Sequence, residues 1–194
     1  MEISKPNEGY IDTDKIKADL NVFLAAPLPS ESPPCPSCEQ HIRSDCNSKC
    51  ANASSSLSID PDKYPIETNI TPLVFEITAT CVMQTCWSCE GHLDENNNLW
   101  KLPNVSFYAK SSIYPQLLVK HIKNLNLNKQ LKYPWQVILA DYAQTLGTTY
   151  TIQPDLCREE EIHLGLLQHD IKTIADDMLE KLKVIARQCL HDLK

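Results

Sequence analysis

Cysteine clustering is the feature that most constrains what this chain can form. Seven of the nine cysteines lie in two short groups. The first group is Cys35, Cys38, Cys46 and Cys50, the second is Cys81, Cys86 and Cys89, and Cys157 and Cys189 stand alone. In a reducing compartment, thiols at such close spacing are typical of metal binding rather than of a disulfide framework. The odd number of cysteines also leaves one thiol unpaired in any all-disulfide arrangement. The grouping therefore predicts a metal-binding protein.

The composition and charge of the chain indicate its cellular compartment and the class of its binding partner. The start of the chain, Met1 to Pro6, lacks a charged segment followed by an apolar run, and no stretch is apolar enough to span a membrane. We therefore expect a cytoplasmic protein. The net charge is −7, and Lys and Arg are concentrated only around Lys181, Lys183 and Arg187. A surface that follows phosphates needs clustered basic residues, so this charge distribution disfavours nucleic acid as a partner. We expect a protein or a small molecule instead.

The first cysteine group has the spacing of a compact zinc site. Cys35-x2-Cys38 and Cys46-x3-Cys50 place four thiols within sixteen residues, enough to surround one zinc ion tetrahedrally. Proline-rich sequence precedes the group over 27–34, and Ser-rich sequence follows it over 51–58. Such sequence has too little apolar surface to fold alone. We therefore predict an N-terminal extension over residues 1–64, ordered by metal, and a folded domain over residues 65–194.

The second group ends in a histidine and matches a common zinc ligand set. It reads Cys81-x4-Cys86-x2-Cys89-x2-His92, and the set of three cysteines and one histidine occurs in many structural zinc sites. Gly91 can take a positive φ, so that the chain turns the imidazole back toward the thiolates. An iron–sulfur cluster is a minority alternative, with Cys157 as the fourth ligand. Bulky residues at 82, 83 and 87 disfavour that alternative.

Two functional classes follow from these ligands. A metal-stabilised interaction module is favoured, because the ligands suffice to fill closed tetrahedra. The alternative is a zinc-dependent hydrolase, in which Cys86, Cys89 and His92 hold the ion, water takes the fourth position and Glu90 is the general base. Ligation by Cys81 distinguishes a closed site from an open one. A cysteine nucleophile or a redox pair at Cys86 and Cys89 accounts for only one of the two groups.

Hydrophobic periodicity predicts an α+β fold. Leu73, Phe75, Ile77 and Ala79 alternate with other residues, which predicts a strand that ends at the second cysteine group. Asn96 to Asn98 mark a turn. Further strands are expected over 105–108, 135–142 and 148–152, and a helix over 115–126. The resulting order β-β-α-β-β-α predicts helices on one face of a small, mainly antiparallel sheet.

Amphipathic helices are expected at both ends of the domain. An apolar stripe from Leu164 to Leu193 predicts one long C-terminal helix of roughly 45 Å. A four-stranded sheet cannot cover so long a stripe. We expect the amphipathic segment over 11–24 to cover the remainder, with a homodimer as the alternative.

Overall fold

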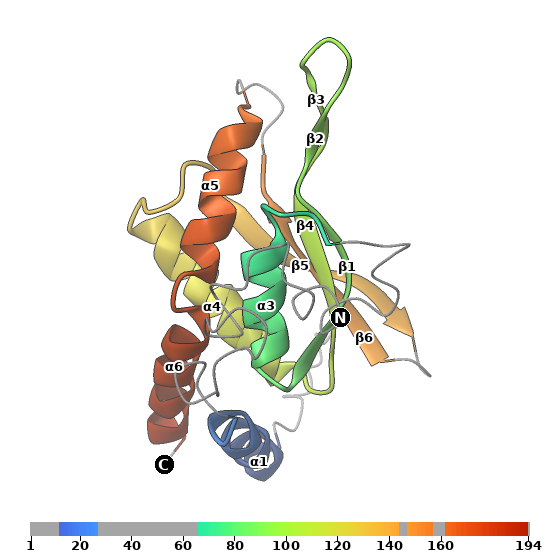
Figure 1. The fold of residues 1–194 in the computed structure, drawn as a ribbon. Coiled ribbons are helices and arrows are strands. Elements are labelled where there is room, and N and C mark those ends of the chain that lie inside the picture. The colour runs from blue at the N-terminus through green and yellow to red at the C-terminus, as the bar shows by residue number, and fades with distance from the viewer. Residues whose placement is uncertain (1–11, 27–65, 144–146, 157–161, 194) are drawn as a thin grey trace, which may run out of the picture.

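The structure, a computed structural model, describes residues 12–26, 66–143, 147–156 and 162–193. Within these residues the chain forms five helices and six strands (Figure 1). Their order is α1 (Thr13–Leu24), α3 (Thr71–Ala79), β1 (Met83–Cys89), β2 (His92–Leu93), β3 (Leu99–Lys101), β4 (Asn104–Ala109), α4 (Ile113–Leu127), β5 (Trp135–Ala143), β6 (Gly147–Pro154), α5 (Leu164–Ala175) and α6 (Met178–Asp192). The first cysteine group, Cys157 and the expected domain boundary at residues 64 and 65 lie outside the described residues.

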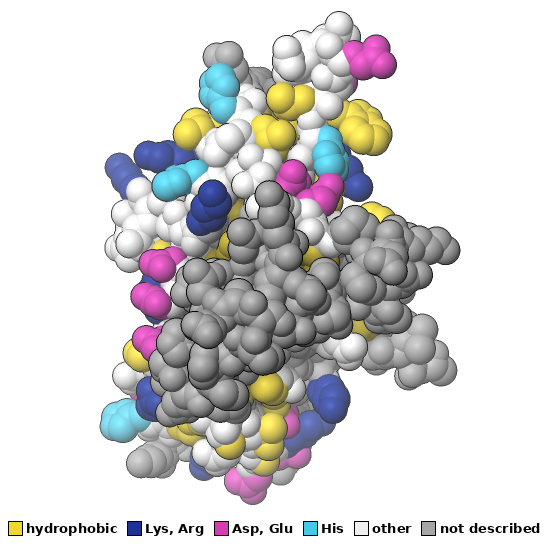
Figure 2. Space-filling model, in the orientation of Figure 1, with side chains coloured by type: hydrophobic (Ala, Val, Ile, Leu, Met, Phe, Trp, Pro, Cys, Tyr) yellow, Lys and Arg dark blue, Asp and Glu magenta, His cyan; other side chains and the backbone are white. Residues whose placement is uncertain are grey.

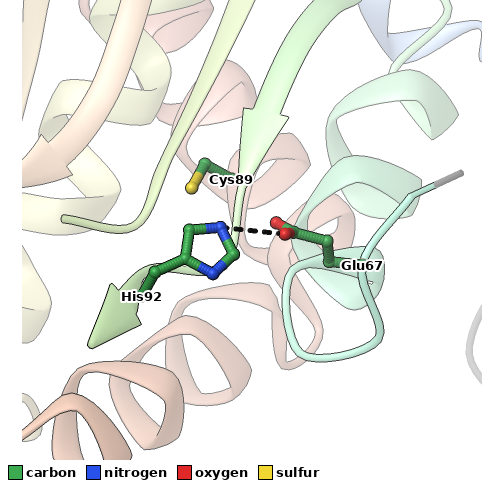
Figure 3. Close-up of side chains that lie close together, drawn as sticks. All are labelled: Glu67, Cys89 and His92. Atoms are coloured by element: carbon green, nitrogen blue, oxygen red, sulfur yellow. Dashed lines mark ion pairs between the residues drawn. The ribbon is translucent and has the colours of Figure 1, made fainter. Parts of the chain in front are cut away.

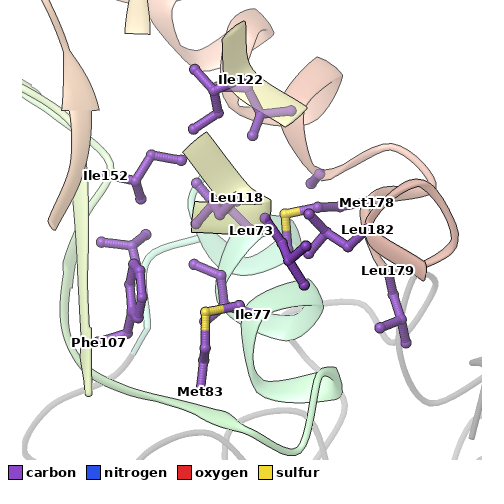
Figure 4. Packing of buried hydrophobic residues seen from close by; sticks show 14 of the residues in the cluster. Leu73, Ile77, Met83, Phe107, Leu118, Ile122, Ile152, Met178, Leu179 and Leu182 are labelled. Atoms are coloured by element: carbon purple, nitrogen blue, oxygen red, sulfur yellow. The ribbon is translucent and has the colours of Figure 1, made fainter. Parts of the chain in front are cut away.

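A four-stranded antiparallel sheet forms one layer of the fold. Its strands lie in the order β1-β4-β6-β5, and helices pack against one of its faces (Figure 1). Alternate residues of β4 and β6 point into the core, where Phe107 and Ile152 face Leu118 of α4 and Ile77 of α3 (Figure 4). The predicted α+β class with a small antiparallel sheet is confirmed. The strands near 105–108, 135–142 and 148–152 and the helix near 115–126 are also present.

The predicted strand that includes Leu73 and Ala79 is wrong, because this segment is helix α3. Nearly every side of the helix is buried, including Leu73, Val74 and Ile77. In a short segment that is buried on all sides, apolar residues show no clear spacing. The spacing of a strand and that of a helix then fit the sequence equally well. Pro72 lies in the first turn of α3, a position that proline favours. The corrected assignment places a helix, not a strand, before the second cysteine group.

The predicted single C-terminal helix is also wrong, because α5 and α6 are separate. Asp177 has a φ of 50°, a left-handed conformation that interrupts the helix. Two buried side chains bond to backbone groups on either side of the break. His121 donates from Nε2 to the carbonyl of Ile174 at 3.1 Å, and a Glu76 carboxylate oxygen accepts from the amide of Leu179 at 2.9 Å. The break lets both helices follow the core, with their apolar stripe continuous across it.

The His121 interaction predicts a pH-dependent stability. Burial lowers the pKa of His121 below its ordinary value of 6.5, and the charge of Lys181 lowers it further, although the bond to Ile174 opposes the shift. The unfolded chain therefore takes up a proton near pH 6.5 that the folded chain resists. We expect the contribution of His121 to the free energy of unfolding to be constant above about pH 7 and to fall below about pH 6.5, by up to about 1.4 kcal/mol per pH unit.

Urea unfolding at pH 7.5 and pH 5 measures this effect. The variant His121→Gln should lose less stability between the two pH values than the natural chain does. His169 is exposed on the neighbouring helix α5, so His169→Gln is the matched control and should keep the natural pH dependence. An equal loss of stability between pH 7.5 and pH 5 in the natural chain and in His121→Gln would show that His121 does not couple proton uptake to unfolding.

Helix α1 packs on α6 and covers part of its apolar stripe, as expected. Leu20 and Phe23 of α1 are buried in the same core as Leu182 and Ala186 of α6. The buried ammonium group of Lys183 donates hydrogen bonds to backbone carbonyls at the end of α1, those of Leu24 and Ala26. A cation is favoured at this end of a helix. The alternative prediction is a homodimer. No described helix is both long and apolar enough to cross a membrane.

A hairpin of β2 and β3 projects from the sheet between β1 and β4 (Figure 1). The turn predicted at Asn96 to Asn98 forms its tip. An Asp94 carboxylate oxygen accepts from the amides of Asn96 and Asn98, at 2.9 and 2.8 Å, and these bonds, mainly that of Asn98, lower the pKa of Asp94. Asn97 takes a positive φ of 61°, which asparagine tolerates. This turn fixes the hairpin whose base lies at the end of β1.

Candidate metal centre

Three side chains of residue types that bind metals lie close together at the junction of β1 and β2. Glu67 precedes α3, Cys89 ends β1, and His92 begins β2 (Figure 3). One ligand atom from each lies within 4.8 Å of the other two. The closest pair is His92 Nε2 and Glu67 Oε1, which are 3.0 Å apart. Within the part of the chain that the structure describes, this is the one group of three or more Cys, His, Asp or Glu side chains near enough to share an ion.

Backbone contacts hold Glu67 in place. Its Oε2 accepts a hydrogen bond from the amide of Glu90 at 2.7 Å, which leaves Oε1 directed at His92. The backbone carbonyl of Glu67 accepts from both the amide and the hydroxyl of Thr71, at 3.2 and 2.8 Å. Partners of this kind orient ligands before an ion binds. These hydrogen bonds fix the orientation of the Glu67 carboxylate relative to His92.

Gly91 makes the turn that brings His92 back toward Cys89. Its φ is +87°, as the sequence predicted from the need for a reversal here. Its surroundings also leave no space for a side chain. A Cβ at this position would lie 2.6 Å from a methyl carbon of Leu164 and 3.2 Å from the carbonyl oxygen of Lys101. Both the conformation and the packing of this turn favour glycine.

We expect Gly91→Ala to weaken both the fold and the site. A side chain in this conformation costs about 1–2 kcal/mol, and the new methyl group must also displace Leu164. Thermal unfolding and zinc titration of the variant measure the two effects. Gly165→Ala is the matched control, because a Cβ there meets nothing within 4 Å, and alanine in helix α5 should add up to about 1 kcal/mol of stability. A Gly91→Ala variant as stable as the natural chain would contradict the role given to this turn.

The donor set suits zinc. A thiolate, an imidazole nitrogen and a carboxylate oxygen are the three donors that zinc takes in proteins, and a tetrahedral site separates them by roughly 3.3–3.7 Å. The separations here are 3.0 Å between His92 Nε2 and Glu67 Oε1 and at most 4.8 Å for the other two pairs. Cys89 is buried, whereas the side chains of His92 and Glu67 are 38% and 34% exposed. An ion here would have its sulfur ligand on the core side and its other two ligands at the surface.

The structure brings Cys89 and His92 together but does not bring Cys81 or Cys86 to them. Cys86 and Cys89 both lie in β1, an extended strand that advances about 3.3 Å per residue. Their backbones are therefore roughly 10 Å apart, and Cys81 lies farther away, in the turn between α3 and β1. The predicted knuckle of cysteines requires a tight loop, but this segment is a strand. The distances between Cys81, Cys86 and Cys89 also disfavour the iron–sulfur cluster, which would need all three as ligands.

Cys86 and Cys81 are both exposed, each in an irregular part of the backbone. Cys86 lies at a bulge in β1, where the pairing with β4 shifts between Thr85 and Trp87. Local desolvation of its thiol raises the pKa of Cys86, although hydrogen bonds including one with Tyr108 oppose the shift. A raised pKa disfavours the thiolate that ligation or nucleophilic attack requires. Cys81 has a φ of 60°, and its thiol donates to the carbonyl of Ala79 at 3.6 Å.

Glu90, the candidate general base, connects three segments at the site. Its Oε2 accepts from the amide of Asn69 at 2.7 Å, its own amide donates to Glu67, and its carbonyl accepts from Gln168 of α5 at 3.3 Å. These bonds give Glu90 a positioning role around Glu67. A role as general base requires its carboxylate to activate a water at the ion while Asn69 holds one of the two oxygens.

Glu67 is the member of the site that the sequence did not reveal. It lies twenty-two residues before Cys89, and no local spacing relates them. Only the return of the chain through α3 and back along β1 places them side by side. The signal that could have revealed this contact is a helix over 71–79, with Pro72 in its first turn. A helix there lets β1 run back alongside α3, which brings the end of β1 to the start of the helix.

Aromatic and charged side chains surround the site at the base of the hairpin. The Trp100 ring lies 6.3 Å from the His92 ring, centroid to centroid, and Trp100 is 73% exposed. The Lys101 ammonium group lies 5.4 Å from the centre of the Trp87 ring, which links the hairpin to β1. Figure 2 shows histidine, acidic, basic and large hydrophobic side chains gathered in this region of the surface.

Comparisons with known proteins identify no relative of this chain. No family model matches it, and no curated protein and no solved structure matches it.

Proposed function

We propose that this chain is a zinc-binding protein of a reducing, cytoplasmic compartment and that it acts as a metal-stabilised interaction module. The observation that supports the proposal best is the convergence of Glu67, Cys89 and His92, because these three donors come from two separate segments and suit one zinc ion. Zinc would lie between His92 Nε2 and Glu67 Oε1, which are 3.0 Å apart. It would then crosslink the segment before α3 to the base of the hairpin.

The first cysteine group is proposed to hold a second zinc ion. Cys35, Cys38, Cys46 and Cys50 supply four thiolates at ligand spacing, independently of the donors at the β1–β2 junction. An iron–sulfur cluster remains the minority proposal for the cofactor. The partner is proposed to be a protein or a small molecule.

A zinc-dependent hydrolase is the second candidate, and one observation favours it. Catalytic zinc sites have three protein ligands and keep the fourth position for water. The group here also has three ligands, and two of them are partly exposed. The ligands would be Glu67, Cys89 and His92 in place of the set that includes Cys86. Glu90 would be the general base only if its carboxylate reached the bound water.

Elemental analysis of the purified protein tests the proposal. Protein prepared without chelators under reducing conditions should contain one to two equivalents of zinc and lack the visible absorption of an iron–sulfur cluster. The variant with Cys35, Cys38, Cys46 and Cys50 all replaced by serine should retain one equivalent. Protein that contains no metal, and takes up none when zinc is added, would end the proposal.

A further inference from the structure

The ligand set at the β1–β2 junction leaves one position of a zinc ion without a described protein donor. Glu67 offers a single oxygen, because its Oε2 is occupied by the amide of Glu90. Among the described residues, no fourth Cys, His, Asp or Glu side chain joins the group. Cys89 is buried, whereas His92 and Glu67 are each about one third exposed, which favours a fourth position on the solvent side of the group.

The charge around this position favours a neutral ligand over an anion. The thiolate of Cys89 and the carboxylate of Glu67 together neutralise a divalent ion. The carboxylate of Glu90 adds negative charge in the same region, since its Oε2 accepts a hydrogen bond from the amide of Asn69, two residues after Glu67. Lys101 supplies a positive charge in the same hairpin, but its ammonium group lies over the Trp87 ring. An anionic fourth ligand would make the site net negative, whereas a nitrogen donor without charge would not.

The shape of the surroundings favours a flat ligand. Trp100 lies next to the ligating ring of His92, with their centroids 6.3 Å apart, and most of its surface is free. An exposed indole beside the proposed ligand His92 offers a face on which a planar ring can stack. Trp87 is also exposed, at 57%, but its ring is paired with Lys101 and not with His92.

We infer that the fourth position of this zinc site takes an imidazole-type ligand, a neutral planar nitrogen donor that stacks on Trp100. The imidazole belongs either to a small molecule or to a histidine side chain of a binding partner. This inference rests on the proposed zinc site, and it specifies the ligand class of that site. It also gives the exposed Trp100 a role that the core of the fold does not require.

Cobalt substitution tests the inference, because the visible absorption of Co²⁺ reports its coordination. The full-length chain with Cys35, Cys38, Cys46 and Cys50 replaced by serine is loaded with Co²⁺ and titrated with imidazole, with azide and with a histidine-containing tripeptide. We expect imidazole to change the visible spectrum and to bind more tightly than azide. Tighter binding of the tripeptide than of imidazole assigns the position to a partner's side chain, and the reverse assigns it to a small molecule.

Trp100→Ala and Trp87→Ala in the same chain isolate the stacking contribution. Trp100→Ala should weaken imidazole binding about two- to tenfold at unchanged Co²⁺ affinity, and Trp87→Ala should leave both unchanged. A Co²⁺ spectrum that does not respond to imidazole, or tighter binding of azide, would overturn the inference while the metal site stands. A chain that binds no Co²⁺ would overturn the zinc site and the inference with it.

Discussion

Replacing Cys89 by serine is expected to lower the zinc affinity of the Glu67–Cys89–His92 site by about a hundredfold or more. The thiolate is the strongest of the three donors, and a serine hydroxyl remains protonated at neutral pH. Zinc bound only to the folded state stabilises it by about 2.7 kcal/mol at a concentration one hundred times the dissociation constant. If the proposed site holds zinc, the variant should therefore lose most of the stabilisation that zinc would give to the natural chain. Competition titration with a chromophoric chelator measures the affinity, and urea unfolding with and without zinc measures the stabilisation.

Cys86→Ser is the matched control for this prediction. Cys86 lies three residues away on the same strand, is exposed, and is not part of the three-residue group. Both variants should be made in a chain whose first four cysteines are replaced by serine, so that the titration reports one site. We expect Cys86→Ser to keep the natural affinity within about threefold. A loss in Cys86→Ser equal to that in Cys89→Ser would favour the cysteine-rich ligand set predicted from the sequence.

Replacing Asp170 by alanine is expected to lower the free energy of unfolding by about 3–5 kcal/mol. Asp170 is fully buried on α5, and its carboxylate accepts three hydrogen bonds from the segment that leads into β5. The donors are the amides of Lys132 and Tyr133, at 2.8 and 3.0 Å, and the indole of Trp135, at 3.2 Å. Alanine would leave donors buried without a partner, in addition to an unfilled volume.

Urea unfolding of Asp170→Ala measures the loss, which should appear as a lower midpoint with an unchanged slope. Asp170→Asn should lose less, because an amide oxygen can still accept part of the network. Asp192→Ala is the matched control, since Asp192 is exposed at the end of α6 and should change stability by less than about 0.5 kcal/mol. An Asp170→Ala variant as stable as this control would show that the three hydrogen bonds are not important to the fold.

Long amphipathic patterns in the sequence predicted their elements, and a short, fully buried segment did not. The stripe of α4 and the alternation in β4 each have one apolar face, so their periods are visible. Helix α3 is apolar on nearly every side, and this removes the contrast on which such predictions depend. The break between α5 and α6 was hidden for another reason. Its stabilising contacts come from Glu76 and His121, which are distant in the sequence.

The candidate site was predictable only where its residues are neighbours in sequence. Cys89, Gly91 and His92 lie within four positions, and the positive φ of Gly91 follows from the reversal that they require. Glu67 was not predictable, because its proximity depends on the path of α3 and β1. Cys81 and Cys86 were included among the predicted ligands on spacing alone. Spacing identifies a knuckle only if the intervening backbone can form a loop, and β1 is extended.

X-ray absorption spectroscopy at the zinc edge tests the central claim most directly, because it counts the sulfur ligands of the ion. The sample is the full-length chain with Cys35, Cys38, Cys46 and Cys50 replaced by serine and loaded with one equivalent of zinc. Coordination by Glu67, Cys89 and His92 predicts one sulfur at about 2.3 Å and the remaining ligands as nitrogen or oxygen at about 2.0–2.1 Å. A shell of three sulfurs would instead place Cys81, Cys86 and Cys89 on the ion and contradict the site described here.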